Sequence, residues 1–275
     1  MIRIFLLLFI SVNSGFTQDF HSPENRKLFA DFLFCSGDHL RAIFEYEEYL
    51  KYYYDDTVIF KVALGYSRIE NFSEAADRFI NISPKSEFYY ISRLEYLKSK
   101  ILFGDLESIN KFTIQNKSVN ETKLVNISYL LSEFVLPEKD RFLIPFDEPD
   151  KEEVQILYNY KKDPPYKSPV AAGILSALVP GSGKLYTGQI SEGITSFLLN
   201  GLFAFISYNN FQNNHNVRGW IFAGVTALFY SGNIYGSAAS AQIYNTRIDY
   251  EYAERVKKYL EVKNYFIDDY DFCNK

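Results

Sequence analysis

Two long stretches without a charged side chain place the strongest constraint on how this 275-residue chain can fold. Residues 193–217 and residues 219–246 contain no Asp, Glu, Lys or Arg. Each stretch is longer than the ~20 residues that a helix needs to cross a bilayer. The polar residues 209–218 join the two apolar cores, 194–208 and 220–241. The pattern therefore predicts a transmembrane helical hairpin.

Small residues recur at every fourth position of the second apolar core. Lipid offers no hydrophobic gain when helices associate, so close backbone approach between small residues has to supply the packing. We expect this face to contact another helix, either the first span or a second copy of the chain. A chance pattern in a Gly- and Ala-rich segment is the alternative. The residues concerned are Ala223, Ala227, Ser231, Gly232, Gly236 and Ser240.

A shorter uncharged stretch, residues 168–183, precedes the hairpin and leads into Gly-Ser-Gly-Lys at 181–184. A phosphate-binding loop of the form GxxxxGK[ST] would need Gly at 178 and Ser or Thr at 185, and the chain has Leu178 and Leu185. This mismatch excludes a nucleotide loop. As a helix the stretch would be only about 24 Å long, so we expect it to dip into the membrane or to lie along its surface.

The stretch LVPGSGKLYTGQ, residues 178–189, resembles a bacterial family of small membrane domains that share a Pro-Gly-x-Gly-x-x-Tyr-x-Gly turn before a two-helix hairpin. The resemblance covers about residues 166–245, and it implies an integral membrane domain without a catalytic residue. The glycines would permit positive φ and a tight reversal, and the tyrosine would lie at the headgroup level; a plain loop is the alternative. The matching positions are Pro180, Gly181, Gly183, Tyr186, Gly188 and Gly193.

The first part of the chain is repetitive. Ala42, Ala75 and Ile109 stand 33 and 34 residues apart, and a short turn such as Gly37-Asp38 comes before each of them. Residues four apart share one face of a helix, so Ala42 with Tyr46, and Ala75 with Phe79, combine a small and a bulky side chain there.

These residues resemble the tetratricopeptide repeat over about residues 24–115. The resemblance implies stacked helical hairpins with a concave surface that binds protein or peptide. An ordinary bundle of helical hairpins is the alternative.

The N-terminal residues 1–17 have the features of a secretory signal peptide. One basic residue, Arg3, precedes an apolar run from Ile4 to Val12, and small residues follow at 15 and 17. An uncleaved anchor is the alternative. Cys35 and Cys273 lie far apart in different contexts, so they do not make a disulfide framework and we interpret both as incidental.

Together these features predict an all-α protein in five parts. Prolines cluster between residues 137 and 169, and the acidic residues 147–153 read as a solvated linker or the start of a helix. Tyr252, Val256 and Tyr259 form an apolar stripe near the C-terminus, and the acidic residues after it read as a solvated tail. The parts are a signal peptide at 1–18, a helical repeat domain at 19–140, a Pro-rich acidic linker at 141–167, a membrane domain at 168–245 with one short helix and two transmembrane helices, and an amphipathic C-terminal helix and tail at 246–275.

Several classes of function are not expected. The net charge of -5 without a basic stripe argues against a nucleic-acid partner. The three histidines, His21, His39 and His215, lie in different parts without a carboxylate or cysteine at ligand spacing. We therefore expect no catalytic, cofactor-binding or metal-binding residue, and no enzymatic activity.

We expect a membrane-tethered helical-repeat protein of the bacterial cell envelope that acts as a protein-interaction scaffold. Its repeat domain would be exported to the periplasm, and its hairpin would lie in the inner membrane, in contact with lipid. The partner would be an unknown protein or peptide. The alternative is a component of a membrane assembly or transport complex whose Gly-rich hairpin associates with a second copy.

Overall fold

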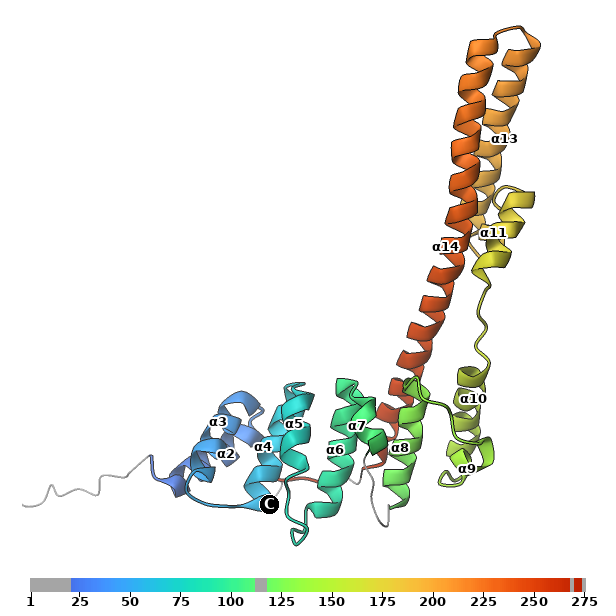
Figure 1. Ribbon diagram of the computed structural model, residues 1–275. Helices are drawn as coiled ribbons and strands as arrows, with labels where there is room; N and C mark the ends of the chain where they lie inside the picture. Colours follow the sequence, from blue (N-terminus) through green and yellow to red (C-terminus); the bar gives the residue numbers. More distant parts are fainter. Residues whose placement is uncertain (1–20, 112–117, 268–269, 274–275) are drawn as a thin grey trace, which may run out of the picture. The chain divides into compact units, whose positions relative to one another are not determined.

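The structure, a computed structural model, describes residues 21–111, 118–267 and 270–273. Within these residues it has thirteen α-helices, one 3-10 helix and no strand, so the predicted all-α class is confirmed. The predicted signal peptide lies outside the described residues. The chain divides into two compact units, Met1–Val135 with Leu260–Lys275 as unit 1, and Leu136–Tyr259 as unit 2. Figure 1 shows the helices of each unit.

Unit 1 is a row of short helices in which each helix packs mainly on its neighbours in the chain. Side-chain caps explain where several of these helices begin. Asp38, Asp55 and Asn71 each accept a hydrogen bond from a backbone N–H of the first turn that follows. The helices are α2 (Pro23–Cys35), α3 (His39–Leu50), α4 (Asp56–Arg68), α5 (Phe72–Phe79), α6 (Tyr89–Phe103), α7 (Leu106–Lys111) and α8 (Val119–Leu131).

The core of unit 1 contains the residues that the repeat pattern singled out. Ala42, Tyr46, Ala75 and Phe79 are all buried, with the small and the bulky residue of each pair on one helix, α3 or α5. Gly37 lies in the turn before α3 with a φ of 85°, which favours glycine because it lacks a Cβ. In α3 and α5 the small and the bulky residue thus share the buried face of one helix.

Unit 2 begins with two helices in the region that was predicted to be a linker. The range 141–167 includes the helix α10 at residues 150–162, so of the two interpretations of the acidic residues 147–153 the start of a helix is the one that the structure has. Acidic residues fill the first turn of α10 and Lys161 and Lys162 the last, which complements the helix dipole. Its buried Leu157 accepts a hydrogen bond from the Tyr252 hydroxyl at 3.1 Å, so α10 covers the apolar stripe near the C-terminus.

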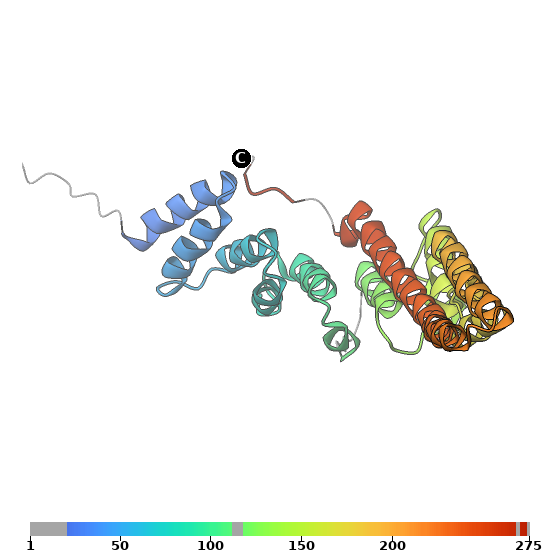
Figure 2. The ribbon, with the colours of Figure 1, turned by 90° about the horizontal axis from the view of Figure 1, so that it is seen from above.

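The helices of unit 2 are α9 (Lys139–Leu143), α10 (Asp150–Lys162), α11 (Pro169–Leu178), α12 (Ser182–Tyr186), α13 (Ile190–Gln212) and α14 (Asn216–Val262), of which unit 2 includes α14 up to Tyr259. Figures 1 and 2 both show α13 lying along the first half of α14. The reversal between them is short, and Asn214 takes a φ of 58° there. The uncharged stretches therefore form a hairpin of two helices.

In the part of the chain that the structure describes, α13 is the one helix long and apolar enough to cross a membrane. The second predicted span, residues 220–241, is part of the 47-residue helix α14, which does not meet the same criterion. Polar residues such as Asn233 and Ser237 lower its mean hydropathy. The predicted boundary at 245–246 also lies inside α14, because no Gly or Pro occurs between 237 and 262 to end the helix.

Candidate functional site

The polarity of residues 169–241 is inverted relative to a water-soluble fold. Their buried side chains include many polar ones, while large apolar side chains cover the outside. A soluble protein buries its apolar residues, whereas a protein surrounded by lipid turns them outward and pairs its polar groups inside. The buried polar residues are Ser176, Thr187, Asn200, Ser207, Asn233, Ser237 and Ser240, and the exposed apolar ones include Ile174, Leu178, Ile190, Ile194, Phe197, Leu198, Leu202, Phe205, Trp220, Ile221 and Leu228.

The glycines of the predicted turn lie where backbones come into contact. Gly181 has a φ of 89°, and a Cβ added to it would lie 2.0 Å from the carbonyl oxygen of Gly193. A Cβ on Gly183 would lie equally close, 2.0 Å, to the carbonyl oxygen of Ala172 in α11. Gly188 has a φ of 83° with open space around it. Two glycines therefore permit close approach, and the third permits only its backbone conformation.

The other two residues of the motif contribute in different ways. Pro180 follows the end of α11 directly, and Val179 before it is extended, as expected for a residue preceding proline. The Tyr186 hydroxyl accepts a hydrogen bond from the Ser168 N–H at 3.2 Å. Lys167 Nζ lies 4.8 Å from the centroid of the Tyr186 ring. Tyr186 therefore ties the end of α12 back to the start of α11.

Three hydrogen bonds hold the α11–α12 segment against α14, and a fourth, from Gly183 to Ser176, closes the turn on α11. The Gly181 N–H donates to Asn233 Oδ1 at 3.1 Å, and the Gly183 N–H donates to Ser176 Oγ at 2.9 Å. The hydroxyls of Ser176 and Ser237 lie 2.6 Å apart, as do those of Thr187 and Ser240. Sequence reasoning had singled out Gly181, Gly183 and Ser240 but missed Ser176, Thr187 and Ser237, whose signal was visible as polar residues at helical spacing within uncharged runs.

The small residues predicted to form one packing face do not share a single partner. Ser240 and Gly236 face the α11–α12 turn, and neither the first span nor a second copy is needed to cover them. Ala223 and Ala227 line a hollow opposite Ser207 and other residues of α13. Ser231 is exposed and donates to the carbonyl of Ala227. Gly232 has open space around it.

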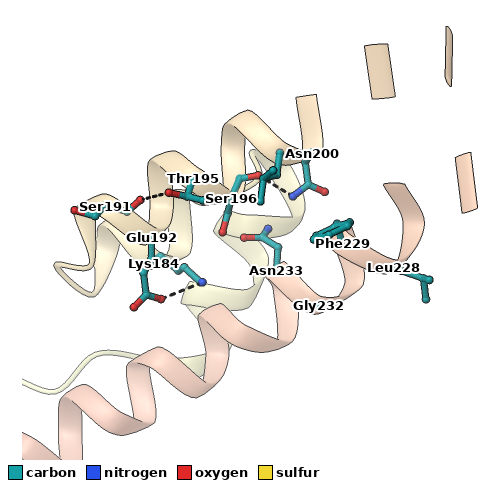
Figure 3. A pocket seen from close by; sticks show the side chains of 11 residues that line it. Lys184, Ser191, Glu192, Thr195, Ser196, Asn200, Leu228, Phe229, Gly232 and Asn233 are labelled. Atoms are coloured by element: carbon teal, nitrogen blue, oxygen red, sulfur yellow. Dashed lines mark hydrogen bonds and ion pairs between the residues drawn. The ribbon is translucent and has the colours of Figure 1, made fainter. Parts of the chain in front are cut away.

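Gly232 forms part of a groove of about 550 Å³ between α13 and α14 (Figure 3). One end carries an ion pair between Lys184 Nζ and Glu192 Oε2 at 3.1 Å. Asn200 and Asn233 lie further along, and Leu228 provides apolar lining. The groove therefore combines a charged end, a polar middle and apolar walls, as sites for small amphiphilic molecules do.

Asn200 has a buried acceptor in this groove that lacks a hydrogen bond. Its side chain is 4% exposed, and its Nδ2 donates to the Ser196 carbonyl at 2.8 Å, yet its Oδ1 has no hydrogen-bond partner. A buried acceptor left without a partner costs about 1–3 kcal/mol. Asn233 differs, because both ends of its amide are hydrogen-bonded. A ligand with a hydroxyl or amine donor that entered the groove would supply the hydrogen bond that Asn200 Oδ1 lacks.

We expect the substitution Asn200→Leu to raise the free energy of unfolding of the detergent-solubilised protein by about 1 kcal/mol, because it removes an unpaired acceptor. The matched control is Asn233→Leu, which leaves the Gly181 N–H without its acceptor and should lower that free energy by about 1–3 kcal/mol. Thermal unfolding of both variants measures the difference. Equal losses in the two variants would mean that Asn200 Oδ1 already has a partner.

Unit 1 contains a disulfide between Cys35 and Cys273, with the Cα atoms 5.5 Å apart. The interpretation of both cysteines as incidental is therefore wrong. The two residues are separated by 238 positions, and only the folded chain brings them together. Nothing in their local sequence indicates that proximity.

The disulfide holds a C-terminal strap against unit 1; we use this name for residues 265–267 and 270–273. Ile267 and Tyr265 are buried, and the rings of Tyr270 and Phe272 lie 5.5 and 5.8 Å from the ring of Phe60 in α4. The expectation of a solvated tail is wrong for the described part of the strap. Two of the acidic residues, 268–269, lie outside the described residues.

No family model matches this chain, and no curated protein or solved structure matches it either. Among the described residues, no cluster of three or more His, Cys, Asp or Glu side chains could hold a metal ion. The groove, the glycine turn and the strap are therefore the features of the chain that bear on its function.

Proposed function

We propose that the protein is a membrane-tethered scaffold in which residues 169–241 anchor the chain in a bilayer and unit 1 binds protein or peptide segments. The observation that carries the tether is the inverted polarity of unit 2. In the most apolar window of α13 only 17% of the residues are buried, whereas a core helix of a water-soluble protein would be mostly buried. Lipid is the solvent that suits such a surface.

The scaffold role rests on the helical hairpins of unit 1. The predicted resemblance to tetratricopeptide repeats and the burial of Ala42 and Ala75 against their bulky neighbours both favour a stack of paired helices. Such stacks present extended surfaces to partners. The glycine motif at 180–188 supports a domain similar to the bacterial membrane hairpins that it resembles.

A disulfide in unit 1 supports export of that unit to an oxidising compartment, because cytosolic thiols are kept reduced. We therefore place unit 1 in the periplasm of a bacterial cell and the tether in the inner membrane. No catalytic role is part of this proposal.

A second candidate function is membrane assembly, in which the hairpin associates with a second copy or with another membrane protein. The groove favours it, because the unpaired Asn200 oxygen could accept a donor from an incoming helix. Asparagine side chains in lipid stabilise helix association by such hydrogen bonds.

Membrane integration is tested by washing cell membranes with alkaline carbonate, which strips peripheral proteins. We expect the protein to stay in the pellet and to be released by detergent. The double substitution Leu198→Lys and Leu202→Lys puts charges on the exposed face of α13, at a cost of about 2.5–3.5 kcal/mol each at the centre of a bilayer, and should shift the protein to the supernatant.

Glu254→Lys, on an exposed position outside the apolar segment, is the matched control and should leave the protein in the pellet. Recovery of the unaltered chain in the carbonate supernatant, without detergent, would contradict the membrane tether.

A further inference from the structure

We propose that the face of unit 1 around Phe60 and Phe88 is a binding site for an extended peptide segment that has a tyrosine, one intervening residue and a second aromatic residue. Tyr270, Asp271 and Phe272 are its resident occupant, and the disulfide to Cys35 keeps them in place. The inference rests on the proposed scaffold function, and it names the site and the chemistry of the segment that the scaffold takes.

The site is a cluster of rings centred on Phe60, which is fully buried. Phe79 and Phe88 contribute rings from the repeat helices and the loop between them, at 5.4 and 5.0 Å from Phe60. The strap supplies the other two, with Phe272 also 5.6 Å from Phe88. Without the strap, unit 1 would present an aromatic patch of the kind that marks an interaction site.

Polar groups around the rings distinguish the two aromatic positions of the segment. The Tyr270 hydroxyl donates to Glu95 Oε1 at 2.5 Å. Burial and the neighbouring Glu95 raise the pKa of Tyr270 above its ordinary value, so the phenol stays protonated and remains a donor. This position therefore selects tyrosine, because phenylalanine would leave the buried Glu95 with one donor fewer.

The second aromatic position lies beside a cation. Lys61 Nζ is 5.3 Å from the centroid of the Phe272 ring and is held by Asp31 at 2.5 Å. A cation near a ring face interacts favourably with the π electrons of phenylalanine, tyrosine and tryptophan alike, so this position accepts aromatic residues in general. The segment that fits is therefore tyrosine, one intervening residue and then an aromatic residue.

The disulfide decides whether the site is open to another segment. Cys35 and Cys273 are both exposed, so a dithiol protein can reach them. A thiolate of that dithiol attacks one sulfur, the Cys35–Cys273 bond breaks, and the other cysteine leaves as a thiolate that takes up a proton. The second thiol of the dithiol then attacks this mixed disulfide. The attack releases the first cysteine as a thiol and oxidises the dithiol to a disulfide. Two electrons and two protons pass to the cysteine pair, and the strap is free to exchange.

The test uses the full-length chain in detergent with Tyr270→Ser, Phe272→Ser and Cys273→Ser, which empties the site and leaves Cys35 as the one cysteine. The probe is a synthetic peptide with the sequence of residues 264–273, NYFIDDYDFC, whose cysteine carries an activating thiol leaving group. The control peptide has serine in place of both Tyr270 and Phe272. Mass spectrometry follows the rate at which each peptide forms a mixed disulfide with Cys35.

We expect the native peptide to react at least tenfold faster than the control peptide at low concentration. Added native peptide without the activating group should compete for the site and slow the reaction of the activated native peptide. Equal rates would overturn the inference. A second variant, Cys273→Ser alone, keeps the aromatic residues of the strap and so guards against loss of folding. Because its own strap competes with the peptide, the preference for the native peptide should shrink to a few-fold but persist. Absence of any preference in this variant would also overturn the inference. The carbonate wash reports on the tether independently, so this inference can fail while the proposed tether stands.

Discussion

Replacing Gly181 by alanine should lower the free energy of unfolding of unit 2 by about 3 kcal/mol or more, the largest effect we expect from a single methyl group. The left-handed conformation at φ 89° costs a residue with a Cβ about 1–2 kcal/mol. The methyl group would also lie 2.0 Å from the Gly193 carbonyl oxygen, and overpacking of this kind costs about 1–3 kcal/mol. Thermal unfolding in detergent, followed by the fluorescence of Trp220, measures the sum.

Two matched glycines separate the contributions. Gly188→Ala keeps the positive φ, at 83°, but meets no atom within 4 Å, so it should cost only the backbone term. Gly201→Ala, inside α13 with open space around it, should cost nothing, because alanine is the better helix former. If Gly181→Ala and Gly188→Ala cost the same, the close approach of the turn to Gly193 does not exist in the protein.

The glycine turn uses within unit 2 the groups with which a phosphate loop would hold its ligand. The Gly181 and Gly183 N–H groups, which a phosphate loop would direct to its ligand, donate instead to Asn233 and Ser176. Lys184 is paired with Glu192. The donors of the apparent loop are therefore already used within unit 2.

The substitution Glu121→Ala should destabilise unit 1 by about 3–5 kcal/mol. The Glu121 carboxylate is almost fully buried, and it accepts a hydrogen bond from Arg93 Nε at 2.5 Å and another from the Ser118 N–H at 2.7 Å. It therefore closes the capping box of α8 and balances a guanidinium that is itself mostly buried. Removing one partner of a buried ion pair leaves the other charge without its counterpart.

Chemical denaturation with the circular dichroism of unit 1 measures this loss. Glu107→Ala is the matched control, because Glu107 pairs with Lys111 on the surface, where both side chains are more than two-thirds exposed, and such pairs contribute little. Glu121→Gln should give an intermediate result, since an amide oxygen can still accept from Ser118 but carries no charge. A loss after Glu121→Ala as small as that after Glu107→Ala would show that Arg93 finds another partner at no cost.

The two units distribute polar and apolar side chains in opposite ways. Unit 1 buries Phe60 and Tyr46 and leaves charged pairs around its core. The α11–α14 region of unit 2 buries Ser176 and Asn233 and turns leucine and phenylalanine outward. This distribution is the one expected of a segment whose polar groups find partners only within itself, as the proposed tether requires.

Much of the helical structure was determined by the sequence alone, because the signals involved are local. Caps such as Asp38 precede helices, Gly37 and Gly181 adopt positive φ, and the spacing of Ala42, Ala75 and Ile109 marks successive helical pairs. Each of these depends on a few neighbouring residues. Length and lack of charge were likewise sufficient to predict a hairpin.

Other features were decided only by the tertiary structure, because they join residues that no local pattern relates. The Cys35–Cys273 bond spans 238 positions, and α14 contacts the α11–α12 turn through Ser240, where its small residues had predicted another long helix as partner. Whether Asn200 has a hydrogen-bond acceptor to spare likewise depends on which atoms surround it. Distances between remote segments arise from the packing of whole helices, and a single sequence records the residues that pack but not the contacts that they make.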